Sequence, residues 1–328
     1  MLGFVRYERG TLMFKIEVLL TENQLAEEML AALEQRYLAE KFFYWLPLSV
    51  KAWLDLCHGE QPYKNYSRSY QLVSKHAAEI ASHCRGTSLE VVSLGPGQGD
   101  KDLLLLQALR SSSCKPRYRP VDSSQALLEL ATERAAEARF NVLGLKADLA
   151  KTETAEALAA CADAPRLYLI LGNTLGVIDP LQFLKTLRAL LRPEDRLLLD
   201  GEIFDAQDTM VGYNNPVNRR FAFAPLASVG VEEGRDGALV FETATDTRLE
   251  GLHLVTKHFR AARRLEIPVA GRRVALEASE KIAMNSSYKY SRAAFLQMVC
   301  EQGGFQKLGE YFSDDARFLM VLAAPQSP

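Results

Sequence analysis

The sequence predicts an α/β protein in which helices connect the strands of a mostly parallel sheet that ends in an antiparallel hairpin. Three observations support this class. Short apolar runs alternate with segments of helical period through the middle third of the chain. A glycine-rich turn at residues 95–99 directly follows the first of these runs. The last two β-like runs are joined only by Ser313-Asp314-Asp315, a link too short for a parallel crossover.

The composition is that of a globular protein with a large core. The chain has 328 residues, 48% of them hydrophobic, and a formal charge of −2, which gives no general attraction to nucleic acid. The length predicts two domains, or one large domain with insertions. No apolar run approaches the ~18 residues that span a bilayer, and Arg6, Glu8 and Arg9 interrupt the start of the chain, where a secretory signal is apolar. We therefore expect a cytoplasmic protein without a membrane or nucleic-acid partner; Met13 is an alternative first residue.

Cysteine and histidine are too scattered to predict a metal site. The five cysteines form no C-x-x-C pair, and the five histidines show no ligand spacing. Cys57 and His58 are neighbours, but adjacent side chains rarely face each other, so we expect a bystander thiol rather than a catalytic pair. The cysteines are Cys57, Cys84, Cys114, Cys161 and Cys300, and the histidines are His58, His76, His83, His253 and His258.

Residues 1–84 are expected to form a helical segment that contributes to the site. Apolar residues recur at helical spacing from Thr21 to Tyr37, and a second helix is expected near Leu72 to Cys84. Between them lies an aromatic stretch, residues 42–45, and then a tyrosine-rich segment. Such aromatic residues are usually core; the alternative is that some of them form the walls of a ligand pocket.

Residues 85–204 are expected to form the core of sheet and helices. Apolar residues line one face of each expected helix, and Pro180 opens the third of them. The expected strands are Glu90–Leu94, Tyr118–Val121, Asn141–Leu145, Arg166–Leu171 and Arg196–Leu199, and the expected helices are Asp100–Arg110, Ser123–Arg139 and one that ends before Pro193.

The alternation stops at about residue 205, which indicates an inserted α+β lobe over residues 205–284. A loop rich in Gly, Asn and Pro is expected first, followed by β-like runs that include a hairpin of Leu265–Val269 and Arg273–Leu276. Residues 285–328 return to the core. They are expected to form a helix from Ser291 to Gln302 and the final strands, Phe305–Phe312 and Phe318–Ala323.

The glycines of the turn, Gly95, Gly97 and Gly99, form the strongest candidate site. Glycine lets the backbone turn sharply and approach a ligand, and the following helix points its N–H groups at the same place. A purely steric role in the turn is the alternative. Asp122 ends the next strand 122 − 99 = 23 residues later, where a ribose diol needs an acceptor. Asp148 follows the third strand, where it can accept a hydrogen bond from an adenine amino group.

Two cofactor classes fit these residues, a nicotinamide dinucleotide and S-adenosylmethionine. The glycines follow a G-x-G-x-G pattern, and Asp100 stands where the dinucleotide fingerprint has its third glycine. The terminal antiparallel hairpin is characteristic of methyltransferases. We therefore favour S-adenosylmethionine.

Seven short motifs extend this interpretation. In chain order they are Phe43-Tyr44, His76-Ala77-Ala78-Glu79-Ile80-Ala81, residues 94–101, Val121-Asp122-Ser123-Ser124, Leu171-Gly172-Asn173-Thr174-Leu175-Gly176, Leu252-His253-Leu254-Val255 and Ser287-Tyr288-Lys289-Tyr290. Through them the sequence resembles, from roughly Leu25 to its C-terminus, the histidine-specific S-adenosylmethionine-dependent methyltransferases of ergothioneine biosynthesis. The resemblance implies a Rossmann-like class I methyltransferase sheet with an added substrate lobe. The residues expected to bind the cofactor are Tyr44, Gly95, Gly97, Gly99, Lys101, Asp122, Asp148 and Asn173.

The substrate positions implied by the resemblance depart from the family pattern. An Asn and a Tyr that help to hold the substrate's α-amino and carboxylate groups are replaced by Val177 and Gln207. A Glu of the imidazole pocket is replaced by Asn285, whereas the Ser two residues later is kept as Ser287. A pocket Met falls on Leu252, and the family's paired tyrosines correspond to Tyr63 and Tyr66.

These departures predict a changed acceptor, because a site built to hydrogen-bond one group discriminates strongly against others. The hypothesis is a methyltransferase that N-methylates a small amine or amino-acid derivative other than histidine. The alternatives are a histidine N-alpha-methyltransferase proper and a non-catalytic S-adenosylmethionine-binding protein. No catalytic base, metal or oligomeric state is predicted, and His253 is expected to face away from the substrate because strand neighbours alternate in direction.

A basic stretch from Lys257 to Arg273 offers a different function. It holds six basic residues and one acid, a local charge of 6 − 1 = +5, which could attract an anionic polymer or a carrier-bound substrate. It has no interleaved aromatic residues, so we expect the solvated face of a hairpin.

Overall fold

The computed structural model describes residues 3–9, 12–60, 63–84, 86, 88–160 and 164–326, with the side chains of residues 3–9, 12 and 13 excepted. Cys161 therefore lies outside the described residues. The chain forms two compact units: unit 1 comprises residues 1–19, 65–203 and 290–328, and unit 2 comprises residues 20–64 and 204–289. The four segments expected from the sequence do not correspond one to one with these units, because the expected N-terminal segment is divided between them. Their separate roles stay a prediction.

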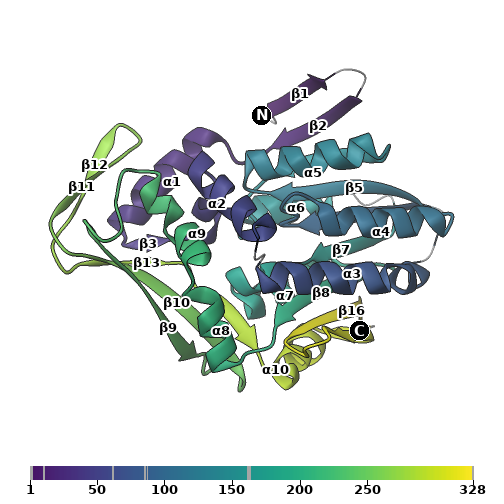
Figure 1. Ribbon diagram of the computed structural model, residues 1–328. Helices are drawn as coiled ribbons and strands as arrows, with labels where there is room; N and C mark the ends of the chain where they lie inside the picture. The colour runs from purple at the N-terminus through teal and green to yellow at the C-terminus, as the bar shows by residue number, and fades with distance from the viewer. Residues whose placement is uncertain are drawn as a thin grey trace. The chain divides into compact units, whose positions relative to one another are not determined.

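Unit 1 is built on a nine-stranded sheet within the described residues, in the order β1-β2-β6-β5-β4-β7-β8-β16-β15 (Figure 1). Strands β2 and β4–β8 run parallel to one another, whereas β1 is antiparallel to β2, and β16 is antiparallel to both β8 and β15. This is the predicted Rossmann-like sheet with a terminal antiparallel hairpin. The strands are β1 Gly3–Arg9, β2 Leu12–Val18, β4 Ser88–Leu94, β5 Lys115–Asp122, β6 Asn141–Lys146, β7 Arg166–Ile170, β8 Arg196–Glu202, β15 Phe305–Phe312 and β16 Phe318–Pro325.

Helices α5, α7 and α10 of unit 1 follow residues whose side chains accept from free N–H groups of the first turn. Ser124 accepts from the backbone N–H of Leu127 at the start of α5, and Asp179 caps α7 just before Pro180. The helices are α3 Lys64–Ser82, α4 Asp100–Ser111, α5 Gln125–Glu137, α6 Thr152–Ala159, α7 Pro180–Leu190 and α10 Arg292–Leu296, with the short 3₁₀ helix η2 Thr174–Val177 and the π-helix η3 Gln297–Gln302, which continues α10.

One hydrophobic cluster joins α3, α4 and α5 to the sheet of unit 1. Leu72 and Ile80 of α3, Leu105 of α4, and Leu167 and Leu198 of the sheet are all buried in it. The helix expected from Leu72 in fact starts two turns earlier, at Lys64, and the added turns are polar rather than amphipathic. Hydrophobic periodicity therefore detected only the part of α3 that packs on the sheet.

Unit 2 has its own sheet, in the order β14-β10-β13-β3 with β9 paired to β10, and a separate hairpin of β11 and β12. The short strand β3 runs parallel to β13, and this pairing joins residues 37–38 to residues 283–284. The elements are α1 Glu22–Glu34, β3 Tyr37–Leu38, η1 Glu40–Phe43, α2 Pro47–His58, α8 Ala206–Tyr213, α9 Pro216–Ala227, β9 Gly237–Thr245, β10 Leu252–Ala261, β11 Leu265–Val269, β12 Arg272–Leu276, β13 Lys281–Met284 and β14 Ser287–Tyr290.

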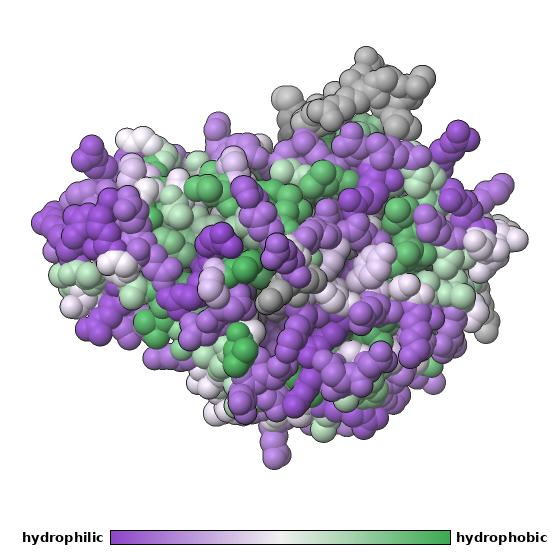
Figure 2. Space-filling model, viewed as in Figure 1, coloured by the Kyte–Doolittle hydropathy of each residue, from purple (hydrophilic) through white to green (hydrophobic). Residues whose placement is uncertain are grey.

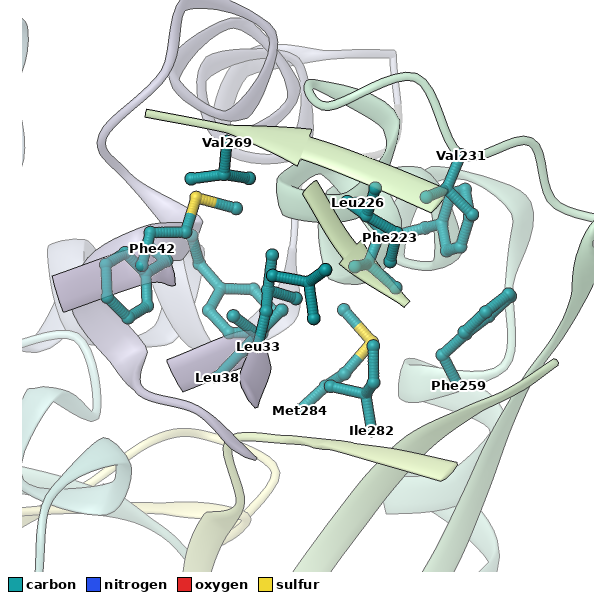
Figure 3. Close-up of a cluster of buried hydrophobic side chains, with 14 of the residues drawn as sticks. Leu33, Leu38, Phe42, Phe223, Leu226, Val231, Phe259, Val269, Ile282 and Met284 are labelled. Carbon is teal, nitrogen blue, oxygen red and sulfur yellow. The ribbon is translucent and has the colours of Figure 1, made fainter. Parts of the chain in front are cut away.

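The core of unit 2 draws on segments that are far apart in the sequence (Figure 3). Leu33 and Phe42 from the N-terminal part meet Phe223 of α9, Phe259 of β10 and Met284 of β13. The expectation that the aromatic stretch is core is confirmed for Phe42 and Phe43, which are 1% and 2% exposed. Because the sheet and this core include residues of both segments, the N-terminal helices α1 and α2 belong to the same unit as the inserted lobe.

The expected helical segment of residues 1–84 also contains the strands β1, β2 and β3. One expectation about secondary structure was wrong, and one helix was missed. The stretch after residue 204 is not a loop but the helices α8 and α9, because Asp205 and Asn215 accept hydrogen bonds from the first turns and Pro216 occupies a first helical position. Helix α2 was not expected, although Pro47 opens it in the same way. In both regions residues that cap helices resemble those that form loops. No helix among the described residues is long and apolar enough to cross a membrane.

Candidate functional site

The glycine-rich loop between β4 and α4 is held in a conformation that side chains rarely adopt. Gly95, Gly97 and Gly99 have φ of 72°, 58° and 78°, all in the left-handed region. A Cβ added at Gly95 would lie 2.8 Å from Cγ2 of Thr174, and one at Gly99 would lie 3.1 Å from Cβ of Ala131. The backbone of the loop therefore passes tightly between η2 and α5, and the α4 N-terminus follows directly.

Asp122 lies beside this loop at the end of β5. Its carboxylate accepts from the Ser124 backbone N–H at 2.9 Å, and its side chain is only 7% exposed. Burial raises the pKa of Asp122 to about 7, and backbone N–H groups of Ser124, Gly97 and Ser123 oppose that rise. The hydrogen bond from Gly97 shows that the loop and the acid, predicted separately, lie together.

Lys101, in the first turn of α4, is buried among charged and aromatic groups. Its Nζ lies 4.9 Å from the ring centroid of Tyr66, and a Cβ added at Gly172 would be 3.3 Å from the same Nζ. The Tyr66 hydroxyl donates to Asp100 at 2.6 Å, and Asp100 also forms an ion pair with Arg134. The structure thus places Tyr66, predicted for the acceptor, against Lys101, predicted for the cofactor.

The remaining predicted residues of unit 1 follow the ends of two parallel strands, β6 and β7. Asp148 comes two residues after β6, is partly exposed, and accepts from the Ala150 backbone N–H at 3.0 Å. Asn173 follows β7 with φ of 64° and is 4% exposed. Val177 ends the short turn η2 after Asn173 and is partly buried. Because parallel strands end at one edge of the sheet, these residues share that edge with the glycine-rich loop.

Tyr44 belongs to unit 2. It lies in a cluster of aromatic rings that could not be predicted from the sequence. Its ring centroid lies 5.2 Å from that of Trp53 and 5.5 Å from that of Phe221, and Trp53 and Phe221 are 5.3 Å apart. The ring of Phe43 also packs near Phe221, with the two ring centroids 6.1 Å apart. Trp53 and Phe221 carry no motif around them, so only the fold brings them to Tyr44.

Three residues predicted to bind the methyl acceptor lie on the main sheet of unit 2 or between its strands. Leu252 opens β10 and is completely buried, and Ser287 opens the neighbouring strand β14 at 4% exposure. Asn285 lies between β13 and β14 with φ of 29° and 7% exposure, and its backbone N–H donates to the carbonyl of Leu38 at 2.8 Å. The three residues therefore lie on or between neighbouring strands of one sheet.

Two further predicted residues lie elsewhere in unit 2. Tyr63 donates its backbone N–H to the carbonyl of Leu56 at 2.8 Å, at the end of α2. Gln207 is exposed in the first turn of α8. His253 stacks on Phe204 with ring centroids 4.1 Å apart, and burial lowers its pKa. No cluster of three or more His, Cys, Asp or Glu residues suited to a metal occurs among the residues that the structure describes.

Three of the six basic residues of the basic stretch form ion pairs. Arg263 pairs with Asp236 at 2.6 Å, Arg264 with Glu266 at 3.0 Å, and Arg272 with Glu27 at 2.6 Å. Hydrophilic residues dominate the surface where the β11–β12 hairpin lies (Figure 2). Lys257 differs from these arginines, because it is partly buried on β10 and its Nζ lies 4.3 Å from the ring centroid of Phe43.

Asp200, in β8, is the buried acid that the sequence analysis missed. It is 0% exposed and accepts from the Gly172 and Asn173 backbone N–H groups at 3.0 and 2.8 Å. The signal was available, because Asp200 directly follows the apolar run 197–199, as Asp122 follows its own strand.

Comparison with known proteins agrees with this geometry. Residues 25–325 match the family described as histidine-specific, S-adenosylmethionine-dependent methyltransferases. A histidine N-alpha-methyltransferase of Mycobacterium tuberculosis is 32% identical over 151 residues, which cover 44% of this chain and 46% of the relative. The protein of that name in Mycolicibacterium smegmatis is 29% identical over 160 residues, covering 45% and 48%. The chain thus spans about half the length of these curated relatives.

Among solved structures, an S-adenosylmethionine-dependent methyltransferase from Clostridium acetobutylicum is similar at 11% sequence identity and a TM-score of 0.42. The alignment covers 85% of this chain and 98% of that one.

Proposed function

Because this chain belongs to the family of histidine-specific, S-adenosylmethionine-dependent methyltransferases, we propose that it transfers methyl groups from S-adenosylmethionine to the nitrogen of a small acceptor other than histidine. One contrast carries the proposal. By the resemblance, the residues expected for the cofactor match the family pattern, whereas Asn285 and Val177 stand where that family has residues that help to hold histidine. The class of acceptor that we propose is a small amine or amino-acid derivative.

The residues of unit 1 fit the proposed cofactor. The left-handed glycines let the loop turn sharply into α4, whose N-terminus directs its N–H groups to the place where we expect the ligand. Asp122 would accept from the ribose hydroxyls, and Asp148 from the adenine amino group. Carboxylate oxygens accept hydrogen bonds from neutral hydroxyl and amino groups, which is what a bound nucleoside offers.

In this reaction the protein's main role is to position the acceptor. S-adenosylmethionine, when bound, supplies a methyl group already activated on a sulfonium. The protein's residues must then hold a neutral acceptor nitrogen in line with that methyl group at about 3 to 3.5 Å, and exclude water from it. No side chain is assigned as the base.

The acceptor selectivity follows from Asn285. A glutamate at this position would place an anion opposite an imidazole N–H, whereas an amide is neutral and offers both a donor and an acceptor. At 7% exposure the position is sheltered from water, so an unmatched hydrogen bond there is costly. A histidine side chain should therefore bind poorly.

Calorimetry tests the two parts of this proposal separately. S-adenosylmethionine and S-adenosylhomocysteine are titrated into the wild type and into Asp122→Ala. Histidine is then titrated into the complex of the wild type with S-adenosylhomocysteine. We expect binding of both cofactor forms, its loss in Asp122→Ala, and no heat with histidine. Absence of cofactor binding to the wild type would refute the methyltransferase assignment; saturable histidine binding would refute the changed acceptor alone.

Histidine is the second candidate acceptor, because the two relatives carry the name histidine N-alpha-methyltransferase. The retained Ser287 and the apolar Leu252 are compatible with it. The histidine titration separates the two candidates.

A further inference from the structure

Asp200 combines complete burial with three hydrogen bonds to its carboxylate. Oδ2 accepts from the Ser69 hydroxyl at 2.5 Å and from the Gly172 backbone N–H at 3.0 Å, and Oδ1 accepts from the Asn173 backbone N–H at 2.8 Å. Burial raises the pKa of Asp200, while these donors and the charge of Lys101 oppose that rise. Since each of the three partners donates, the ionised carboxylate is the form that fits this site.

The two backbone donors belong to an unusual turn. Gly172 and Asn173 have φ of 79° and 64°, so two successive residues after β7 are left-handed. Successive N–H groups in such a turn converge on one anion, and here that anion is the Asp200 carboxylate. Asn173 is held a second time, because its Oδ1 accepts from the Glu202 backbone N–H at 3.1 Å.

The turn fixed by Asp200 lies against Lys101. The 3.3 Å from Lys101 Nζ to a Cβ added at Gly172 means that the amine passes directly over this glycine. Lys101 is 8% exposed, and its charge acts on both Asp200 and Asp102. A change in the Asp200 charge would therefore reach Lys101 through the electrostatic field as well as through the turn.

The third donor comes from α3, which links Asp200 to a different element. Ser69 shares α3 with Asn65, which donates to Glu202, and with Tyr66, which donates to Asp100 at 2.6 Å. Helix α3 thus bonds two acids of β8 and the first residue of α4, and Asp200 is the acid that also holds the turn after β7.

We propose that Asp200 is a positioning residue for the cofactor: its carboxylate sets the turn of Gly172 and Asn173 and the place of Lys101, and Ser69 couples that arrangement to α3. This inference rests on the proposed function, because Lys101 and Asn173 are residues through which we expect S-adenosylmethionine to be held. Asp200 itself acts through them.

Asp195 provides a matched control at the other end of β8. It immediately precedes β8, is 0% exposed like Asp200, and binds Arg166 at 2.8 Å, at the edge of the sheet opposite the glycine-rich loop. Asp195→Asn should therefore lower stability without changing the cofactor site. Asp200→Asn keeps the side-chain size but turns an amide N–H₂ toward the donors and removes the charge beside Lys101.

The experiment measures the Kd of S-adenosylhomocysteine and the thermal midpoint for both variants. We expect Asp200→Asn to raise Kd at least tenfold and Asp195→Asn to leave Kd within twofold, even where the two midpoints fall equally. An unchanged Kd in Asp200→Asn, or an equal loss in both variants, would overturn the inference. If the wild type binds no S-adenosylhomocysteine, the proposed function itself has failed; if it binds and Asp200→Asn binds equally, only this inference has failed.

Ser69→Ala decides the matter if Asp200→Asn does not fold. It removes one donor from Asp200 and leaves the carboxylate in place, and we expect Kd to rise about threefold. Ser82→Ala, at the far end of α3, where the hydroxyl bonds only the Glu79 carbonyl at 2.6 Å, should leave Kd unchanged. Equal Kd values for Ser69→Ala and Ser82→Ala would contradict the coupling.

Discussion

Among single residues, Asp122 is buried beside the glycine-rich loop, and its charge should govern the affinity for the cofactor. Its pKa is raised to about 7 by burial, and hydroxyl donors from a ribose favour the ionised form. Binding should therefore release a proton below that pH, so the Kd of S-adenosylhomocysteine should fall as the pH rises to about 7 and then level off. Calorimetry between acid and mildly alkaline pH checks this.

The raised pKa of Asp122 affects the stability of the unliganded protein in the opposite direction: binding strengthens as the pH rises, whereas the fold becomes less stable. Between the ordinary value of 3.8 and about 7 the folded protein binds the proton more tightly than the unfolded chain, so the free energy of unfolding should fall as pH rises through this window. Asp122→Asn should flatten both dependences. A pH-independent Kd in the wild type would contradict the assignment of Asp122 to the ribose.

Lys257 supplies a stability prediction in unit 2. Burial, with the charge of Lys289 added and that of Glu40 opposing, lowers its pKa to about 8 from 10.5. The unfolded chain keeps a proton that the folded chain loses between these values, so the free energy of unfolding should rise with pH through this window. Lys257→Met should remove the cost of the buried charge and stabilise the protein by roughly 1–2 kcal/mol at pH 7, after the lost contact with Phe43 is subtracted.

Chemical denaturation at pH 7 and at pH 10 measures this effect. Lys281→Met, on the neighbouring strand β13 and exposed, is the control and should change stability little. A loss of stability in Lys257→Met at pH 7 would show that the ammonium contributes more than its burial costs.

At the scale of elements, the loop between β4 and α4 should tolerate no side chain at its first glycine. Alanine at position 95 would be left-handed, with its Cβ 2.8 Å from Thr174, and we expect Gly95→Ala to cost about 2–4 kcal/mol. Gly212→Ala in α8 meets nothing within 4 Å and should stabilise by up to about 1 kcal/mol. Denaturant unfolding distinguishes them, and equal effects would contradict the packing of the loop.

The elements that the sequence predicted are those with a strong local pattern. Strands β4–β8 are short apolar runs, and the terminal hairpin has a short link, so their type followed from their own residues. Helices α8 and α9 did not, because Asp205, Asn215 and Pro216 cap helices and also occur in loops. The two polar turns at the start of α3 were missed for a related reason: they make hydrogen bonds to acids of the sheet rather than hydrophobic contacts.

At the scale of the whole molecule, the division into units depends on pairings that no local pattern encodes. Strand β3 is only two residues long, yet its pairing with β13 connects the N-terminal part to the inserted lobe. The glycine-rich loop and Asp122 could be predicted together because both follow adjacent strands. The cluster of Tyr44, Trp53 and Phe221 could not, since it forms only when η1, α2 and α9 pack within unit 2.

The most direct test of the proposed acceptor is mass spectrometry of histidine incubated with S-adenosylmethionine and three proteins: the wild type, Asn285→Glu and Asn285→Gln. We predict no methylated histidine from the wild type, methylated histidine from Asn285→Glu, where the anion opposite the imidazole is restored, and none from Asn285→Gln, which matches the size without the charge. Methylated histidine formed by the wild type would contradict the account.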